Sequence, residues 1–198
     1  MRAWAPTPGR PSEIFPVPDP SLPIVTPSLR LRHFVVEDGP RILALSQEDA
    51  ARRWLVSQVY RDAGHAQKVL QALISAYTEP GDPRRGPYVL AVEHRGSGSL
   101  VGHVGFSPLG EAVEIGFAMA EALQGRGLAT EAVVAASRWV MASFGLAQII
   151  GVTAADNEAA RHTMARAGFG HVEDKKMIFQ GTEQGVSVYA FACAALEA

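Results

Sequence analysis

The sequence contains one cysteine, Cys193, and no apolar run of the roughly 18 residues that a membrane-spanning helix needs. A single thiol cannot form an internal disulfide, which indicates a reducing compartment, and we interpret Cys193 as a buried structural thiol. The N-terminus also lacks the apolar core of a signal peptide. We therefore predict a soluble, cytoplasmic protein with no membrane partner.

An excess of positive charge is also lacking. The chain has 18 Lys and Arg against 20 Asp and Glu, for a net charge of -2. This balance does not supply the broad basic surface that binding to nucleic acid by charge requires, so no nucleic-acid partner is expected. A chain of 198 residues with 47% hydrophobic content can bury one sizeable core, which predicts a single domain.

Prolines are concentrated at the N-terminus, where eight of the 13 fall within residues 1–27. Proline removes backbone donors and disfavours regular elements, so we predict an extended arm over residues 1–23 and one domain over residues 24–198. The arm could wrap the domain or a partner subunit in a homodimer. Alternatively, it is a poorly ordered tail in which Trp4 and Phe15 are incidental anchors.

The remaining pattern predicts both strands and helices. Alternating or apolar runs predict strands over residues 29–35, 88–93, 100–106, 112–119, 147–153, 169–173, 177–180 and 186–192. Helical spacing predicts helices after Asp38, around 50–55, over 65–77, over 127–144 and over 157–168. Asp38 is the expected cap of the first helix, with Pro40 in its first turn, and Pro108 is expected in a turn. The β-branched strand 147–153 is expected to be buried and parallel to strand 112–119.

The stretch Gln124-Gly125-Arg126-Gly127 lies between a predicted strand and the long predicted helix. Glycine allows the backbone to approach a bulky ligand, and the first turn of a helix presents N–H groups without intrahelical partners. These donors, the positive end of the helix dipole and Arg126 together predict a site for anionic phosphate.

Three segments in the same order and spacing resemble the GNAT superfamily of acetyl-CoA-dependent N-acetyltransferases. Gln124-x-x-Gly127-x-Ala129 is similar to the family signature Q/R-x-x-G-x-G/A, and the flanking residues 129–132 resemble the ribosomal-protein (RimJ/RimL-like) branch. The other two segments are Glu114–Phe117 and Asn157–Phe169. The resemblance spans roughly residues 24–195 and leaves the proline-rich arm outside.

The resemblance implies an α+β (α/β three-layer) fold, with a mixed, mostly antiparallel sheet of about seven strands, helices on both faces, and the fourth and fifth strands parallel and splayed. It also implies that acetyl-CoA is the co-substrate and that no metal is needed. The pyrophosphate would rest on the backbone amides of the glycine loop, and the pantetheine would bond to main-chain groups of the fourth strand. The implied cofactor-binding residues are Phe117, Ala118, Met119, Gln124, Gly125, Arg126, Gly127, Leu128, Ala129, Thr130 and Asn157. Asn157 could equally be a simple helix cap.

Acetyl transfer to an amine needs a neutral amine, a donor for the developing oxyanion and a proton for the leaving thiolate. Glu114 is the candidate base, directly or through water, because its strand lines the substrate cleft; a solvated or salt-bridged glutamate is the alternative. His103 is a second catalytic candidate, with a structural histidine as the alternative. We expect the oxyanion donor to be a main-chain N–H near Ala118.

Two positions depart from the family pattern. Many GNAT enzymes have a tyrosine acid seven residues after the helix-opening asparagine, where this chain has Met164, and the common serine three residues after it is Ala160. Water or another hydroxyl would then protonate the thiolate, whose pKa lies only about one to two units above 7. The alternative is an acyl-CoA-binding regulatory module with little or no turnover.

A dinucleotide-binding oxidoreductase is the competing class, because Gly125-x-Gly127 stands between a strand and a helix. Thr130 replaces its third glycine, and the unit is not repeated. The main prediction is therefore direct transfer of an acetyl group, in a ternary complex, to a primary amine. The acceptor could be a protein N-terminal α-amine or a small molecule, and nothing in residues 46–87 distinguishes the two. The aromatics Trp54 and Tyr60 are interpreted as core or rim residues.

Overall fold

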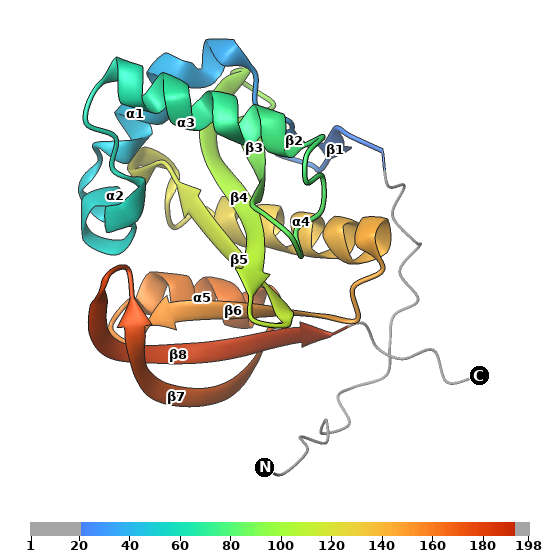
Figure 1. Cartoon of the computed structure of the whole chain (residues 1–198), viewed down its shortest axis with the longest axis vertical. Helices are drawn as coiled ribbons and strands as arrows, with labels where there is room; N and C mark the ends of the chain where they lie inside the picture. The colour runs from blue at the N-terminus through green and yellow to red at the C-terminus, as the bar shows by residue number, and fades with distance from the viewer. Residues whose placement is uncertain (1–20, 193–198) are drawn as a thin grey trace.

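The computed structural model describes residues 21–192, shown in colour in Figure 1. The predictions made for Trp4, Phe15 and Cys193 lie outside these residues. Within the described range no helix is both long and apolar enough to cross a membrane. The strands are β1 (Ile24–Val25), β2 (Leu29–Arg32), β3 (Tyr88–His94), β4 (Ser99–Leu109), β5 (Ala112–Met119), β6 (Gln148–Ala154), β7 (Gly170–Phe179) and β8 (Thr182–Ala192). The helices are α1 (Gly39–Ser46), α2 (Asp49–Trp54), α3 (Ala63–Ala76), α4 (Leu128–Phe144) and α5 (Glu158–Arg166), with short 3-10 turns η1 (Val36–Asp38), η2 (Val56–Gln58) and η3 (Glu121–Leu123).

The described strands form one sheet in the order β1-β2-β3-β4-β5-β6-β8-β7. Neighbouring strands in residues 21–192 are antiparallel except for the parallel pair β5 and β6. Helices lie on both faces of the sheet (Figure 1). The predicted mixed α+β fold, with its parallel pair at residues 112–119 and 147–153, is therefore confirmed.

The parallel pair is short. β5 and β6 are in register only at Glu114 with Ile150 and at Ile115 with Gly151. From Phe117 onwards β5 stays paired with β4 but not with β6, which instead pairs along its whole length with β8. The predicted splay is confirmed, and it leaves an opening between the carboxyl ends of β5 and β6.

Helix α4 packs one face against the sheet and begins and ends at glycines in the left-handed region. Gly127 has φ 79° and Gly145 has φ 62°, values that favour residues without a Cβ. The buried stripe includes Leu128, Ala132 and Trp139, which join a core cluster with the inward-facing residues of β2 to β6. Burying each larger side chain contributes about 1.5–3 kcal/mol, so this interface fixes where α4 begins relative to β5.

A second apolar cluster holds α1 and α3 on the opposite face of the sheet. Phe34, Ile42 and Leu70 pack there with Ala91 of β3 and Leu100 of β4. In Figure 1, α1 and α3 lie over one end of the sheet, and α2, which lies between them in the chain, is at its margin. The two sides of the sheet thus have separate cores, and residues of both cores line the cavity described below.

Asp38 occupies the N-cap position of α1, as predicted, but its side chain makes no capping hydrogen bond to α1. Its carboxylate instead accepts two hydrogen bonds from the Arg32 guanidinium, at 2.8 and 3.0 Å, and one from the Val35 N–H at 3.0 Å. Arg32 also binds Glu93 at 2.9 Å. A partly buried guanidinium is a stronger partner for a carboxylate than a helix N–H, which explains the difference. Pro40 does lie in the first turn, as predicted.

Two strand boundaries also differ from the prediction. The segments 169–173 and 177–180 are one strand, β7, because β8 pairs with it continuously through the charged residues 173–176. Strand β4 extends through Pro108, and the turn falls at Gly110 and Glu111. Pro108 is tolerated there because the pairing of β4 with β3 stops at Phe106, opposite the first residue of β3, so no neighbour on that side needs its missing N–H.

Candidate active site

A cavity of about 760 Å³ begins in the opening between β5 and β6 and continues across the sheet face under α1, α2 and α3. Every residue predicted for the site lines this cavity except Arg126, which is exposed and lies outside its wall. We call the part beside the α4 N-terminus (residues 124–130) the cofactor half. The part bounded by β3, β4, α1 and α3 is called the acceptor half.

The cofactor half is formed largely by backbone. Gly125 and Gly127 have φ values of 72° and 79°, and a Cβ built on either would meet no heavy atom within 4 Å. The amides of Leu128, Ala129 and Thr130 form the first turn of α4, where N–H groups have no intrahelical acceptor. An open floor with unpaired donors fits an anionic group of phosphate size.

The ladder between β4 and β5 decides which backbone groups of β5 face the opening. The Ala120 N–H donates to the Val101 carbonyl at 2.7 Å, on the β4 side. Because bonding pairs alternate along an antiparallel ladder, the main-chain groups of Ala118 face β4 as well. Those of Phe117 and Met119 therefore face the opening. The expected donor at Ala118 is thus directed into the sheet, and Phe117 and Met119 have the available groups.

Two amide side chains border this opening. Gln124 donates from Nε2 to the Met119 carbonyl at 3.1 Å, which leaves the Met119 N–H for a ligand. Asn157 accepts from the Ala160 N–H through Oδ1 at 3.1 Å and so caps α5. Its Nδ2 has no hydrogen-bond partner among residues 21–192, so a capping role and a ligand-binding role are compatible.

Glu114 lies on the acceptor side of β5, opposite Ser107 of β4. Its carboxylate lines the cavity and makes no hydrogen bond or ion pair with the described residues. Burial raises the pKa of the Glu114 carboxyl above its usual value. A carboxylate that is poorly solvated and unpaired is a stronger base than an exposed one.

His103 lies on the same face of the sheet, between Ala91 of β3 and Ala118 of β5. Burial lowers the pKa of its imidazole to about 4, although the residue keeps some solvent access through the cavity. His103 and Ser107, which is opposite Glu114, are four residues apart on β4. At about 3.3 Å per residue His103 and Ser107 lie about 13 Å apart along β4, so His103 and Glu114 do not form a hydrogen-bonded pair.

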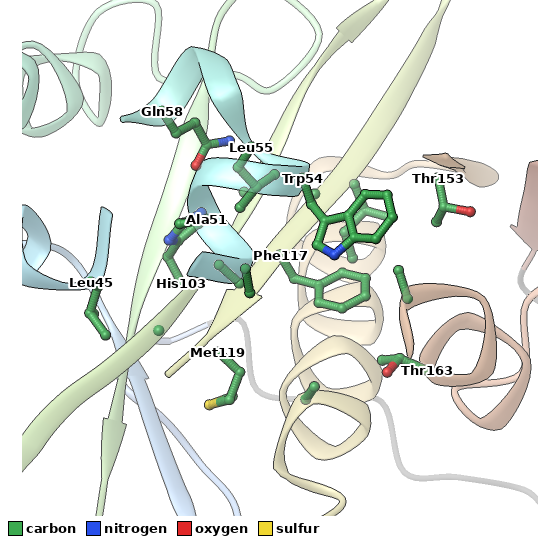
Figure 2. A pocket seen from close by; sticks show the side chains of 18 of the residues that line it. Leu45, Ala51, Trp54, Leu55, Gln58, His103, Phe117, Met119, Thr153 and Thr163 are labelled. Carbon is green, nitrogen blue, oxygen red and sulfur yellow. The ribbon is translucent and has the colours of Figure 1, made fainter. Parts of the chain in front are cut away.

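Met164 fills core space beside the cofactor half. Its side chain is fully buried and packs against Gly151, where a Cβ would stand 2.6 Å from the Met164 Cε. Nearby hydroxyls are not aimed at the opening. Thr163 donates to the Ala159 carbonyl at 2.9 Å, and the buried Thr153 hydroxyl points away from the middle of the cavity in Figure 2. Met164, Thr163 and Thr153 therefore do not supply a proton donor for a leaving thiolate.

The segment from α2 to η2 forms part of the cavity wall, and the sequence did not indicate the contacts that hold it there. Trp54 points into the cavity, as does Phe117 of β5 (Figure 2). The Glu121 N–H donates to the Glu48 carboxylate at 2.8 Å, and the Ala50 N–H donates to the Glu121 carboxylate at 2.5 Å. These contacts join residues more than seventy positions apart in the chain, so no local pattern could have revealed them.

The far end of this segment is bonded to the β7–β8 turn. Ser57 contacts the Gln180 side-chain oxygen through its hydroxyl at 2.7 Å and its N–H at 3.3 Å. Gln180 has φ 51°, in the left-handed region, which a two-residue hairpin turn requires. The segment from Glu48 to Ser57 is therefore attached at both ends, to η3 and to the β7–β8 turn. We call it the α2 strap.

Comparison with known proteins agrees with this geometry. Residues 28–170 match the acetyltransferase (GNAT) domain family. The chain is 26% identical over 170 residues to the uncharacterized N-acetyltransferase YoaA of Bacillus subtilis, covering 83% of this chain and 93% of that protein. The match to the family covers more than half of the chain, so the protein belongs to the GNAT acetyltransferases, a family of acetyl-CoA-dependent acyltransferases.

Solved structures share the fold at lower identity. An acetyltransferase of the GNAT family from Bacillus anthracis superimposes with a TM-score of 0.73 at 21% identity, covering 86% of this chain and 98% of that one. RimL, a ribosomal L7/L12 α-N-protein acetyltransferase solved with coenzyme A, gives a TM-score of 0.74 at 18% identity, covering 88% and 98%. At these identities the likeness concerns the fold.

Proposed function

We propose that this protein transfers the acetyl group of acetyl-CoA to a primary amine by direct attack within a ternary complex. One observation carries the proposal: the unpaired backbone of the cofactor half and the unpaired carboxylate of Glu114 line a single continuous cavity. A binding module would need the first of these features but not the second.

The cofactor half suits the shape and charge of CoA. The amides of Gly125 to Thr130 are proposed to bind the pyrophosphate, as at other helix N-termini. The free main-chain groups of Phe117 and Met119 would bond to the pantetheine as an added strand would. The Asn157 Nδ2 is proposed to donate to the pantetheine. That the RimL structure was solved with coenzyme A supports this assignment.

Glu114 is proposed to accept the proton that the amine loses as it attacks the thioester carbon. Its raised pKa and its place on the acceptor side of β5, where β5 and β6 begin to separate, support this role. The Phe117 N–H is the proposed oxyanion donor in place of Ala118. His103, with a pKa of about 4, would be neutral at pH 7 and act only as a polar contact for the acceptor.

The new C–N bond forms as the C–S bond breaks, and the proton from the amine is balanced by one taken up by the thiolate. No side chain identified above donates that proton, so water is the proposed donor, which suffices because a thiol pKa is only about 8.5. Among the described residues of the cavity wall there is no cysteine, which favours direct attack over an acyl-enzyme.

Initial rates of thiol release test the proposal, with acetyl-CoA and an amine varied together. A ternary complex gives intersecting double-reciprocal lines, whereas parallel lines would contradict direct attack. Binding of acetyl-CoA without thiol release from any amine or N-terminal peptide would favour a regulatory module. Binding of NAD without CoA would overturn the assignment of the glycine loop.

A further inference from the structure

The floor of the acceptor half is bare at its centre. On the sheet face turned to α1 and α3, Gly105 of β4 lies opposite Gly116 of β5, between the row of His103 and the row of Glu114. A Cβ on Gly116 would meet nothing within 4 Å, and one on Gly105 would stand 3.1 Å from a methyl group of Val89. Gly116 therefore leaves an open trough beside Glu114, and this trough ends at the Val89 side chain of β3, which covers Gly105.

The trough leads to an apolar end. Above Val89 the cavity wall is made by side chains of α1, α3 and the segment before them. These residues are Phe34, Ile42, Leu45, Val69 and Leu73. Ser46, Tyr60 and His65 also line the cavity on this side, so a group that enters this end loses its water and gains mainly apolar contacts beside a few polar ones.

Charge is scarce along the whole cavity. Apart from its histidines, the acidic and basic side chains in its described wall are Glu48, Glu114 and Arg166. Glu48 already accepts from the Glu121 N–H, and Arg166 belongs to α5, beside the cofactor half. The acceptor half therefore has one free carboxylate, Glu114, which the reacting amine would occupy. A second charge on the acceptor would be buried without a partner, which is strongly unfavourable.

The α2 strap is held in place as part of the cavity wall. Its bonds from Glu48 and Ala50 to Glu121, and from Ser57 to Gln180, attach it to η3 and to the β7–β8 turn. The cavity of about 760 Å³ contains both the cofactor half and the acceptor half, which favours a small acceptor.

We propose that the acceptor is a small monoamine whose remaining part is uncharged and apolar, and that this part occupies the space above Val89 and Gly105. The inference rests on the proposed transferase function. Cationic polyamines, amino carboxylates and charged peptide N-termini are then poor acceptors.

Three acceptors of matched length test the proposal with the full chain and acetyl-CoA. Hexylamine, hexamethylenediamine and aminocaproate share a chain of six carbons and differ at the sixth, which is a methyl, a methylene that carries an ammonium, or a carboxylate. We expect kcat/KM for hexylamine to exceed that for the other two by about 100-fold or more, because neither charge finds a partner. A peptide with a charged second residue serves as the macromolecular comparison and should be no better than hexamethylenediamine.

Leu73→Asp should change this order by placing a carboxylate at the apolar end. It is expected to lower kcat/KM for hexylamine and raise it for hexamethylenediamine. Gain of the diamine activity cannot arise from misfolding. Gln71→Asp adds the same charge on the exposed side of α3 and should leave both values unchanged.

The outcomes separate the two levels of the proposal. Equal kcat/KM for the three acceptors, or faster acetylation of the peptide, would overturn the acceptor class while the transferase function stands. Absence of thiol release from every amine, with acetyl-CoA still bound in calorimetry, would instead overturn the transferase function.

Discussion

The cofactor half and the acceptor half of the cavity are built from different material. The first consists of main-chain groups held at fixed angles, such as the amides beyond Gly127 and the unpaired edge at Phe117. The second consists of side chains from segments distant in sequence, such as Trp54 and Leu73. Main-chain recognition tolerates sequence change, whereas a wall of side chains alters with each substitution. The cofactor is therefore set by the fold and the acceptor by the particular chain.

Gly127→Trp should have the largest effect, because it places a side chain in the open floor of the cofactor half. We expect acetyl-CoA affinity to fall by at least about 100-fold, equivalent to about 2.7 kcal/mol, in isothermal titration calorimetry.

Gly110→Trp is the matched control. Gly110 also has positive φ and open space around it, but it lies in the β4–β5 turn away from the cavity. If both variants bind acetyl-CoA normally, the cofactor half has been wrongly located.

Glu114→Gln should lower kcat by about 100-fold, in the usual range for loss of a general base, with acetyl-CoA affinity nearly unchanged. The base must be ionised, and the pKa of Glu114 is raised by burial. As pH decreases, the rate of the native enzyme should therefore fall with a midpoint pH above the ordinary pKa of glutamate. Glu111→Gln, on the exposed β4–β5 turn, should change neither parameter. An unaltered rate for Glu114→Gln would remove this residue from the base role.

The acceptor half should make the free energy of unfolding depend on pH, because His103 is buried there with a pKa of about 4. Its folded-state pKa lies below the unfolded value of about 6.5, so the unfolded chain binds the proton more readily between these two values. Stability is lost as pH falls through this window.

Across this pH window, the free energy of unfolding of the His103→Gln variant should fall by about 1–3 kcal/mol less than that of the native chain. Urea unfolding of both chains at several pH values measures the difference. His94→Gln, outside the cavity wall, provides the control. Parallel stability curves for the native and His103→Gln chains would show that His103 is not buried in its neutral form.

Substitutions of Asn157 should have the smallest and most selective effects, since its Oδ1 caps α5 while its Nδ2 faces no protein partner in residues 21–192. Asn157→Asp keeps the capping acceptor and should raise the KM for acetyl-CoA about fivefold, the worth of one hydrogen bond, without loss of stability. Asn157→Ala should in addition lose about 1 kcal/mol of stability. If the Asn157→Asp variant has the same KM as the native enzyme, the residue is a cap alone.

The sequence indicated the cofactor half because its signals are local. Gly125 and Gly127 are adjacent to the helix they start, whereas the splay of β5 and β6 was implied by the resemblance to the GNAT family. The Asp38 side chain makes no cap to α1 because its partner Arg32 competes with the helix, and pairing of that kind depends on tertiary geometry. The contacts of the α2 strap could not be foreseen for the same reason, since Glu48 and Glu121 meet only in the folded chain. Met164 could be noted as a departure, but only its burial against Gly151 explains what it does.

The bare floor at Gly116 also has a meaning for engineering. Its backbone needs no special dihedral, and nothing occupies the space where a side chain would stand. A glycine in a strand interior costs roughly 0.5–1 kcal/mol relative to alanine, so this position gives up stability that a single methyl group would restore. The size of the side chain at position 116 would therefore limit the length of the acceptor that fits in the trough. Replacing Gly116 with alanine, valine or leucine would shorten that acceptor progressively, while the framework of the sheet stays the same.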